Sequence, residues 1–318
     1  MRTFLLAIIA IFLLTAVDLL VPTTTNAVDF SLGVYPPIIQ IQADAPSVIT
    51  KDLTLVNASD SQMSVALQLR MFTQTTDNNG QVSYSTNQPY PDRALFQKVQ
   101  LLDNGNPIGG ITLAPKQKKT LTLRIALPQG EQPADYYFSL LFLSNAPVAS
   151  TTNGSQINAG IAANVLLSIG PKGPTTGFLN EFSAPHLVQT GPIPFTVSVN
   201  NTSDHYITPT GQIIIHNMFG QLIGKVALLP VNILQHSSRY IPSKGEEHAA
   251  HPVVLWNEKV LFGLYQARLS IALSREGPLF TKTIYFFAMP ISYLIGFIVT
   301  IFLVVIIILR VREKMHEA

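Results

Sequence analysis

The chain has 318 residues and no cysteine, with 20 Lys and Arg against 18 Asp and Glu, and 47% of its residues are hydrophobic. This length predicts about two domains. The lack of cysteine excludes disulfides, thiolate nucleophiles and most structural zinc sites. The nearly balanced charge gives no strong field for collecting phosphate backbones, so nucleic-acid binding is not expected.

Residues 1–27 are predicted to be a secretory signal peptide. Arg2 precedes the uncharged run Phe4–Val17, and a polar stretch ends at Ala27, where cleavage would occur. As a helix the apolar run is about 21 Å long, which is short for a hydrocarbon core of about 30 Å. An uncleaved N-terminal anchor remains the alternative, because Thr25 and the long polar region weaken the cleavage site.

The body of the chain is predicted to consist of β-strands. Apolar residues alternate with other residues, the pattern of half-buried strands, and turn-forming residues separate these rows at short intervals. The clearest rows are Leu53 and Leu55; Met63, Val65, Leu67, Leu69 and Met71; and Leu121, Leu123, Ile125 and Leu127. We therefore predict an all-β body of two tandem immunoglobulin-like β-sandwiches, residues 28–170 and 178–283, joined by a Pro- and Gly-rich linker at 171–177.

Two echoes between the halves indicate a duplicated module. The stretches Asn57–Asp60 and Asn201–Asp204 both follow the pattern Asn-x-Ser-Asp, 144 residues apart. They also fit the glycosylation pattern, but we interpret them as turns. A late strand begins with tyrosine in each half, at Tyr136-Tyr137 and at Tyr265. In immunoglobulin-like sandwiches such a hydroxyl can bond to the backbone of the preceding turn.

Residues 284–309 are predicted to form one C-terminal transmembrane helix. The segment carries no charge over 26 residues, and its Ile291–Leu309 part is long enough to span, about 28 Å as a helix. Tyr285, Phe286, Phe287 and Tyr293 would form an aromatic belt, and Arg310, Arg312 and Lys314 follow the inner end. The positive-inside rule then makes 310–318 a cytoplasmic tail and the protein a single-pass cell-membrane protein with an extracytoplasmic body.

No enzymatic motif is present, so we predict neither catalysis nor a cofactor nor a small-molecule substrate. The sequence lacks the nucleophile elbow G-x-S-x-G and the phosphate-binding loops. Glu247, His248 and His251 could ligate zinc, but Pro242, Gly245 and Pro252 favour a loop, and no metal site is expected. A metal-dependent hydrolase built on these three residues remains an alternative.

Short motifs carry a resemblance to a family. These are Leu53–Asp60, Leu113–Gln117 and Pro133–Tyr137 in the first half, and Asn232–Arg239 followed by Phe262–Tyr265 in the second. With them the chain resembles the WxL-interacting proteins, which are bacterial surface proteins with a peptidoglycan-binding domain, a second immunoglobulin-like domain and a C-terminal membrane helix. Gln235 stands where that family usually has proline. The early-strand pattern is also similar to periplasmic pilus chaperones, which lack a membrane helix.

Two surfaces are candidate contact sites. The loop 78–92 carries Tyr84 and Tyr90 and is followed by Arg93, a composition typical of non-enzymatic recognition loops. Lys116, Lys118 and Lys119 could contact anionic wall polymer, or they could form a solvated edge that blocks strand pairing. We expect the single indole, Trp256, in the core rather than on a sugar-stacking surface.

The predicted function is non-catalytic binding at the bacterial cell surface. From the resemblance, the partners would be peptidoglycan or wall-associated and secreted proteins, held by the immunoglobulin-like domains of a membrane-anchored chain. The alternative is a membrane-tethered chaperone or assembly factor for secreted surface subunits. It predicts an exposed early strand near Ile38–Gln42 that pairs with a client.

Overall fold

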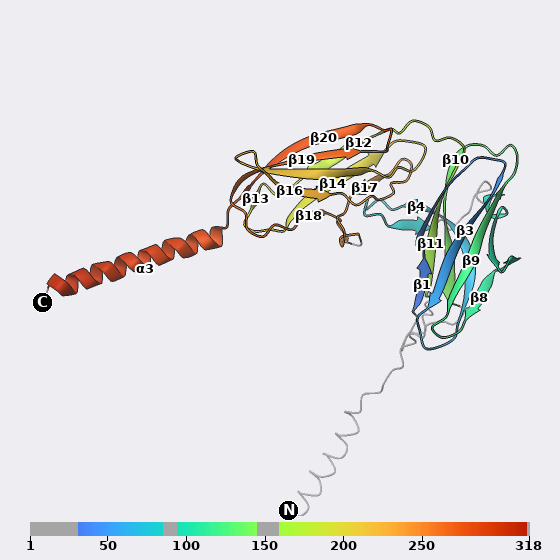
Figure 1. Cartoon of the computed structure of the whole chain (residues 1–318), viewed down its shortest axis with the longest axis horizontal. Coiled ribbons are helices and arrows are strands. Elements are labelled where there is room, and N and C mark those ends of the chain that lie inside the picture. Colours follow the sequence, from blue (N-terminus) through green and yellow to red (C-terminus); the bar gives the residue numbers. More distant parts are fainter. Residues whose placement is uncertain (1–30, 85–93, 145–158, 248, 317–318) are drawn as a thin grey trace, which may run out of the picture.

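The computed structural model describes residues 31–84, 94–144, 159–247 and 249–316, so the predicted signal peptide lies outside the described residues. The chain forms two β-sandwiches and a C-terminal helix (Figure 1). The strands of the first sandwich run across the direction of those in the second, and the helix extends from the end of the second sandwich that is far from the first (Figure 1). The molecule is thus bent where the sandwiches meet.

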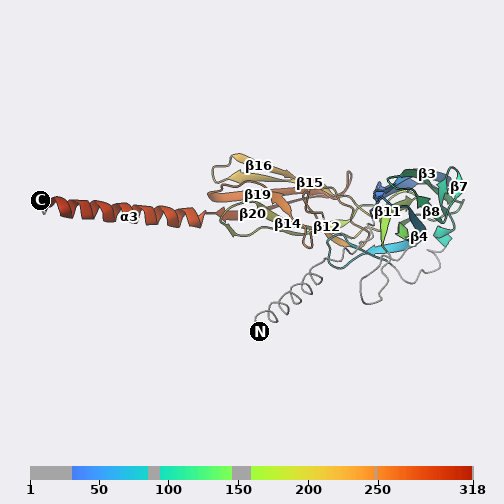
Figure 2. The ribbon, with the colours of Figure 1, turned by 90° about the horizontal axis from the view of Figure 1, so that it is seen from below.

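The first sandwich is built from two sheets that lie in separate layers, with β3 and β4 on opposite sides (Figure 2). One sheet has the order β1 (Leu32–Tyr35), β3 (Ser47–Asn57), β9 (Lys118–Leu127), β6 (Val99–Asp103) and β7 (Asn106–Pro107). The other has the order β2 (Ile38–Ala43), β11 (Gly160–Ile169), β10 (Ala134–Ser144), β4 (Met63–Gln74) and β5 (Val82–Tyr84), with β8 (Gly110–Leu113) beside β4.

The predicted alternating rows form the core between these sheets, as expected for half-buried strands. Leu53, Leu55, Leu121, Leu123 and Ile125 are almost completely buried, and they face Phe138, Leu140 and Phe142 within one cluster. The period-two pattern therefore predicted both the strands and their inner faces.

The second sandwich has its own core. One sheet consists of β12 (Gly177–Ser183), β14 (Ile193–Asn201) and β17 (Ser238–Tyr240), with β18 (Val254–Trp256) also paired to β14. The other has the order β13 (Leu187–Val188), β20 (Leu279–Ala288), β19 (Gly263–Ala272), β15 (Thr210–Asn217) and β16 (Leu222–Ala227). Trp256 lies in this core, which confirms its expected burial.

The predicted aromatic belt is wrong, because its first residues belong to a strand. β20 continues to Ala288 and pairs with β19 over its whole length. Phe286 is buried, and its ring stacks on that of Tyr265 with the centroids 5.3 Å apart, whereas Tyr285 on the opposite face is exposed. The uncharged end of β20 and the uncharged first part of α3 give one continuous apolar run, so composition alone did not separate them.

The predicted transmembrane helix is also corrected. The helix α3 (Ile291–His316) does not end at Leu309 but continues through Arg310, Arg312 and Lys314. In the part of the chain that the structure describes, no helix has both the length and the apolar character that crossing a membrane requires. This finding leaves the predicted span 284–309 unconfirmed. It overturns the single-pass cell-membrane localisation, including the cytoplasmic tail that the three basic residues were expected to orient.

Candidate functional site

The predicted contact loop contributes to the junction between the sandwiches. Tyr84 ends β5 and is partly exposed, while Tyr90 and Arg93 lie outside the described residues. The turn between β4 and β5 faces the second sandwich, because the carbonyl oxygen of Asn78 accepts a 2.8 Å hydrogen bond from the backbone N–H of Tyr240. The part of this loop that the structure describes therefore holds the two sandwiches together.

The three lysines lie at the start of β9 and in the turn before it. Lys116 Nζ donates to the carbonyl oxygen of Ala58 at 2.7 Å and is 3.0 Å from a carboxylate oxygen of Asp60. Lys119 Nζ is 2.8 Å from a carboxylate oxygen of Asp103. Lys118 is exposed at the start of the strand. Two of these charges are thus paired within the chain, and binding of wall polymer by the group stays a prediction.

A small aromatic cluster joins the sandwiches. Phe72 of β4, Tyr137 of β10 and Leu166 of β11 contribute from the outer face of one sheet, and Tyr206 and Leu234 contribute from loops of the second sandwich. The rings of Tyr137 and Tyr206 meet edge to face, with centroids 6.5 Å apart. Aromatic pairs favour this arrangement because the edge of one ring is positive and the face of the other negative.

The carboxylate of Asp135 also links β10 of the first sandwich to the loop of the second sandwich that carries Tyr206. Its Oδ2 accepts hydrogen bonds from the hydroxyl of Tyr137 and from the backbone N–H of Tyr206, both at 2.9 Å. Burial and the nearby carboxylate raise the pKa of Tyr137, so its hydroxyl stays a neutral donor. Lys172 Nζ lies 3.7 Å from the centroid of the Tyr206 ring, a cation–π contact. One carboxylate therefore ties β10 to a loop of the second sandwich.

A second set of contacts clamps β4 and β5 onto β17. The side-chain amide of Gln74 donates to the carbonyl oxygen of Ser238. The guanidinium of Arg239 lies against Gly80, whose φ is +86°, and a Cβ at position 80 would overlap it. Glycine is therefore favoured at position 80 by its backbone conformation, and a larger residue there would have to shift the guanidinium.

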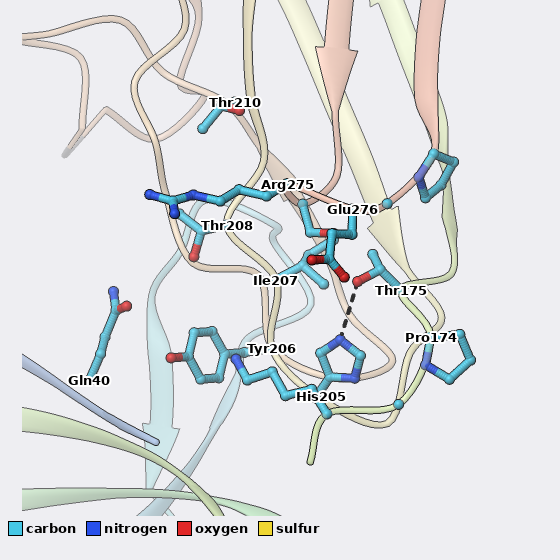
Figure 3. A pocket seen from close by; sticks show the side chains of 15 residues that line it. Gln40, Pro174, Thr175, His205, Tyr206, Ile207, Thr208, Thr210, Arg275 and Glu276 are labelled. Carbon is cyan, nitrogen blue, oxygen red and sulfur yellow. Dashed lines mark hydrogen bonds between the residues drawn. The ribbon is translucent and has the colours of Figure 1, made fainter. Parts of the chain in front are cut away.

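Cavities open at this junction between the described parts of the two sandwiches, and they include the following two. The first, of about 730 Å³, is lined by linker residues 172–175, residues 205–208 and the turn 274–278. The ring of His205 points toward Thr175, with Nε2 at 3.4 Å from Oγ1, and Arg275 and Glu276 flank the cavity (Figure 3). Burial, and then the charge of Lys172, lower the pKa of His205. The second cavity, of about 430 Å³, includes Gly80 and Arg239 in its wall.

The structure does not show a zinc site for the metal-dependent hydrolase alternative among the described residues. Among the described residues, no group of three or more His, Asp and Glu side chains is arranged to hold a metal ion. His248 lies outside the described residues, and Glu247 Oε2 accepts a hydrogen bond from the backbone N–H of Gly245 at 2.7 Å.

On one side, the first part of β11 has no paired strand among the described residues, although β1 lies close to β11. The sequence did not predict this edge. β10 pairs with β11 from Gly160 onward, but β2 pairs with β11 only from Asn164 onward. Pro37, just before β2, lacks the N–H that would extend this pairing. Within the described residues, β11 therefore has no partner strand on that side from Gly160 to Ala163.

The hydrogen-bond pattern shows which backbone groups of this edge point away from β10. Ser144 N donates to Ala159 O, and Asn164 N donates to Pro37 O. Antiparallel pairs alternate between bonded and non-bonded positions, so the N–H and C=O groups of Gly160 and Ala162 point away from β10. The neighbouring β2 is the edge strand of its sheet, with Ile38 47% exposed, as the assembly-factor alternative predicts.

No family model and no curated protein matches the chain. Among solved structures it is similar to the class 5 fimbriae chaperone CfaA, with 11% identity over 82% of this chain and 100% of that one, at a TM-score of 0.34. It is similar to the E. coli chaperone DraB, with 12% identity over 80% of this chain and 96% of that one, at a TM-score of 0.35.

A PapD-like domain of human CEP192 is also similar, with 12% identity over 43% of this chain and 84% of that one, at a TM-score of 0.27. Likeness at this level concerns the immunoglobulin-like fold alone.

Proposed function

We propose that the protein is a non-catalytic assembly factor that binds an extended segment of a secreted protein by adding it as a strand to β11. The observation that supports this most is the free edge at Gly160–Ala163, where two residues direct their N–H and C=O groups away from β10. An added strand gains affinity from backbone hydrogen bonds, whatever its sequence.

The surroundings of this edge set the side-chain pattern of the partner. Ala163 is buried in the core of the first sandwich, and Ile161 packs against that core. Alternate side chains of an added strand face the same side of the sheet. A segment with apolar residues at every second position would therefore continue the buried face, while its other side chains would face outward.

The proposal is tested at a backbone N–H that proline can remove without breaking the pairing with β10. Ala162→Pro deletes an outward-pointing donor, and Ala162→Thr, the matched control, keeps it. The probe is a synthetic peptide about ten residues long with alternating Val and Ser, and a peptide of the same composition with its valines in one block is the comparison.

We expect the alternating peptide to bind the full chain and the Thr variant, and to protect the amides of residues 160 and 162 from hydrogen exchange. The Pro variant should lose this binding. Equal binding by the Pro and Thr variants, or binding without protection at these two amides, would remove strand addition at β11 from consideration.

Membership of the WxL-interacting proteins, and with it contact with the wall, remains a separate proposal that the resemblance motivates. It is checked by sedimenting the full chain with insoluble peptidoglycan. Retention that falls when Lys116, Lys118 and Lys119 are all changed to Ala would support it. Absence of retention by the unchanged chain would exclude it while leaving strand addition at β11 unaffected.

A further inference from the structure

Arg239 of β17 is a partly buried cation whose Nε is fully buried, and the described residues provide no acidic partner for it. Its Nη1 donates to the carbonyl oxygen of Asn232 at 2.7 Å, but its Nε is buried without a hydrogen-bond partner. None of the ion pairs among the described residues includes it. A guanidinium does not lose its proton in proteins, and a buried charge without a counter-charge is costly. The site is therefore electrostatically incomplete.

Arg239 lies in the wall of the second junction cavity, whose volume of about 430 Å³ is in the usual range of ligand pockets. Part of that wall is apolar and is formed by Ile38, Leu229, Pro230, Val231 and Ala249. The polar part includes Asn79, Gln81, Asn232 and Glu247. A smaller cavity of about 90 Å³ reaches the same guanidinium beside Phe72 and Leu166. The cation thus adjoins open space with a largely apolar lining.

We propose that this cavity binds an organic carboxylate with an apolar body, whose carboxylate pairs with Arg239 while its body lies against Leu229 and Val231. A guanidinium matches a carboxylate with two parallel hydrogen bonds, and such charge-assisted bonds are stronger than neutral ones. A phosphate fits less well, because Glu247 lies in the same wall and would repel a doubly charged group more strongly than a singly charged one.

The first sandwich holds the guanidinium ready for this ligand. Gly80 lies against its plane, and a Cβ there would displace it, so its position depends on the turn between β4 and β5. The cavity is built from both sandwiches and includes none of the residues at the free edge of β11. The proposed ligand site is therefore independent of strand addition and can fail without affecting it.

The test measures the melting temperature and the binding heat of the full chain with hexanoate and with N-acetyl-leucine. Hexanamide and N-acetyl-leucinamide, which have the same bodies without the charge, are the matched controls. We expect at least one acid to bind saturably and raise the melting temperature, and the corresponding amide to do neither. Preference for hexanoate would indicate a free acid as ligand, and preference for N-acetyl-leucine would indicate a chain terminus; both support the carboxylate site.

Arg239→Met should weaken acid binding by about 10- to 100-fold, the loss expected for a charged hydrogen-bonded pair. If that variant does not fold, a second pair of variants decides the matter. Ala249→Phe fills the cavity with Arg239 unchanged, and the exposed neighbour Ala250→Phe is its control. Equal binding of acids and amides, or equal affinity of the two Phe variants for the acid, would overturn the proposal.

Discussion

The two sandwiches use the same buried asparagine in the same way. Asn57 and Asn201 are both fully buried, and each side-chain nitrogen donates to three backbone carbonyl groups. Each side-chain oxygen accepts from the N–H of the serine two positions later, Ser59 or Ser203, at 3.0 and 2.9 Å. The carbonyl acceptors are those of Ser61, Leu113 and Ala114 in the first sandwich and of His205, Ile233 and Leu234 in the second.

The sandwiches differ in what their late-strand tyrosines hold. The hydroxyl of Tyr265 accepts from the N–H of Phe262 at 2.9 Å and lies 3.2 Å from its carbonyl oxygen, so it closes the turn before its own strand. Tyr137 instead donates to Asp135, which also binds the N–H of Tyr206. The tyrosine hydroxyl therefore makes a hydrogen bond within the second sandwich, whereas in the first it belongs to a group of hydrogen bonds that joins the two sandwiches.

Removing the buried asparagine that both sandwiches share should cost more stability than removing a tyrosine hydroxyl. Asn201→Ala leaves three buried carbonyl groups without this donor, and we expect the second sandwich to lose about 3 kcal/mol of stability. Trp256, the only tryptophan, lies in that core, so its fluorescence during urea unfolding reports on the second sandwich. Asn57→Ala should leave this transition nearly unchanged. The control is Thr202→Ala, an exposed neighbour, and an equal shift in both would contradict the assignment.

The sequence showed this frame but not the junction. The repeated Asn-x-Ser-Asp, the tyrosine that follows its turn at Tyr265 and the alternating strands are local signals, and each was found in its expected place. The bond from Tyr206 to Asp135 joins residues 71 positions apart, and nothing in either segment marks the other. Arg239 had a place in a family motif, but the sequence could not show that it packs against Gly80.

The C-terminal error has the same origin. Residues 284–288 at the end of β20 are as free of charge as a helix in lipid, and only two uncharged residues separate β20 from α3. Alternation offered the distinguishing signal: Tyr285 is exposed, Phe286 is buried and Phe287 is partly exposed, which is the period of a strand. Counting charges over the whole segment concealed that period.

The different roles of Tyr265 and Tyr137 should appear as a loss of stability smaller than that of the asparagine variant. Tyr265→Phe leaves the N–H of Phe262 without its acceptor, and we expect the Trp256 transition to lose about 1–2 kcal/mol. Tyr137→Phe should leave that transition where it is, because its hydroxyl bonds to the first sandwich and the junction. If both variants shifted the Trp256 transition equally, the two hydroxyls would not have different roles.

Removing the junction carboxylate should have a smaller effect that concerns the linker. Asp135→Ala takes the acceptor from Tyr137 and Tyr206, and Lys172, which contacts the Tyr206 ring, is a trypsin site in the linker. We expect tryptic cleavage after Lys172 to become about fivefold faster, corresponding to about 1 kcal/mol of lost contact. Asp204→Ala, at a largely exposed aspartate of the second sandwich, is the control. Unchanged cleavage in the Asp135 variant would mean that the carboxylate does not hold the junction.

The smallest expected effect is a pH dependence that enters through His205. Burial lowers its pKa and so does the charge of Lys172, while Asp135 and Asp204 partly oppose them. In the unfolded chain a histidine titrates near its ordinary pKa of about 6.5. As the pH falls below about 6.5, the unfolded state therefore takes up the proton first, and this part of the stability decreases toward acid. The neighbouring Thr175 hydroxyl is the group's hydrogen-bonding partner and carries no charge of its own.

His205→Gln should reduce the dependence of stability on pH, whatever its effect on the overall stability. The measurement is the urea midpoint of the Trp256 transition at pH 7.5 and at pH 5.5, compared with His251→Gln, which alters an exposed histidine of the same sandwich. The difference between the two pH values should shrink only in the His205 variant. An unchanged difference would mean that His205 is equally easy to protonate in both states, and that the linker contact at Thr175 does not depend on its neutral form.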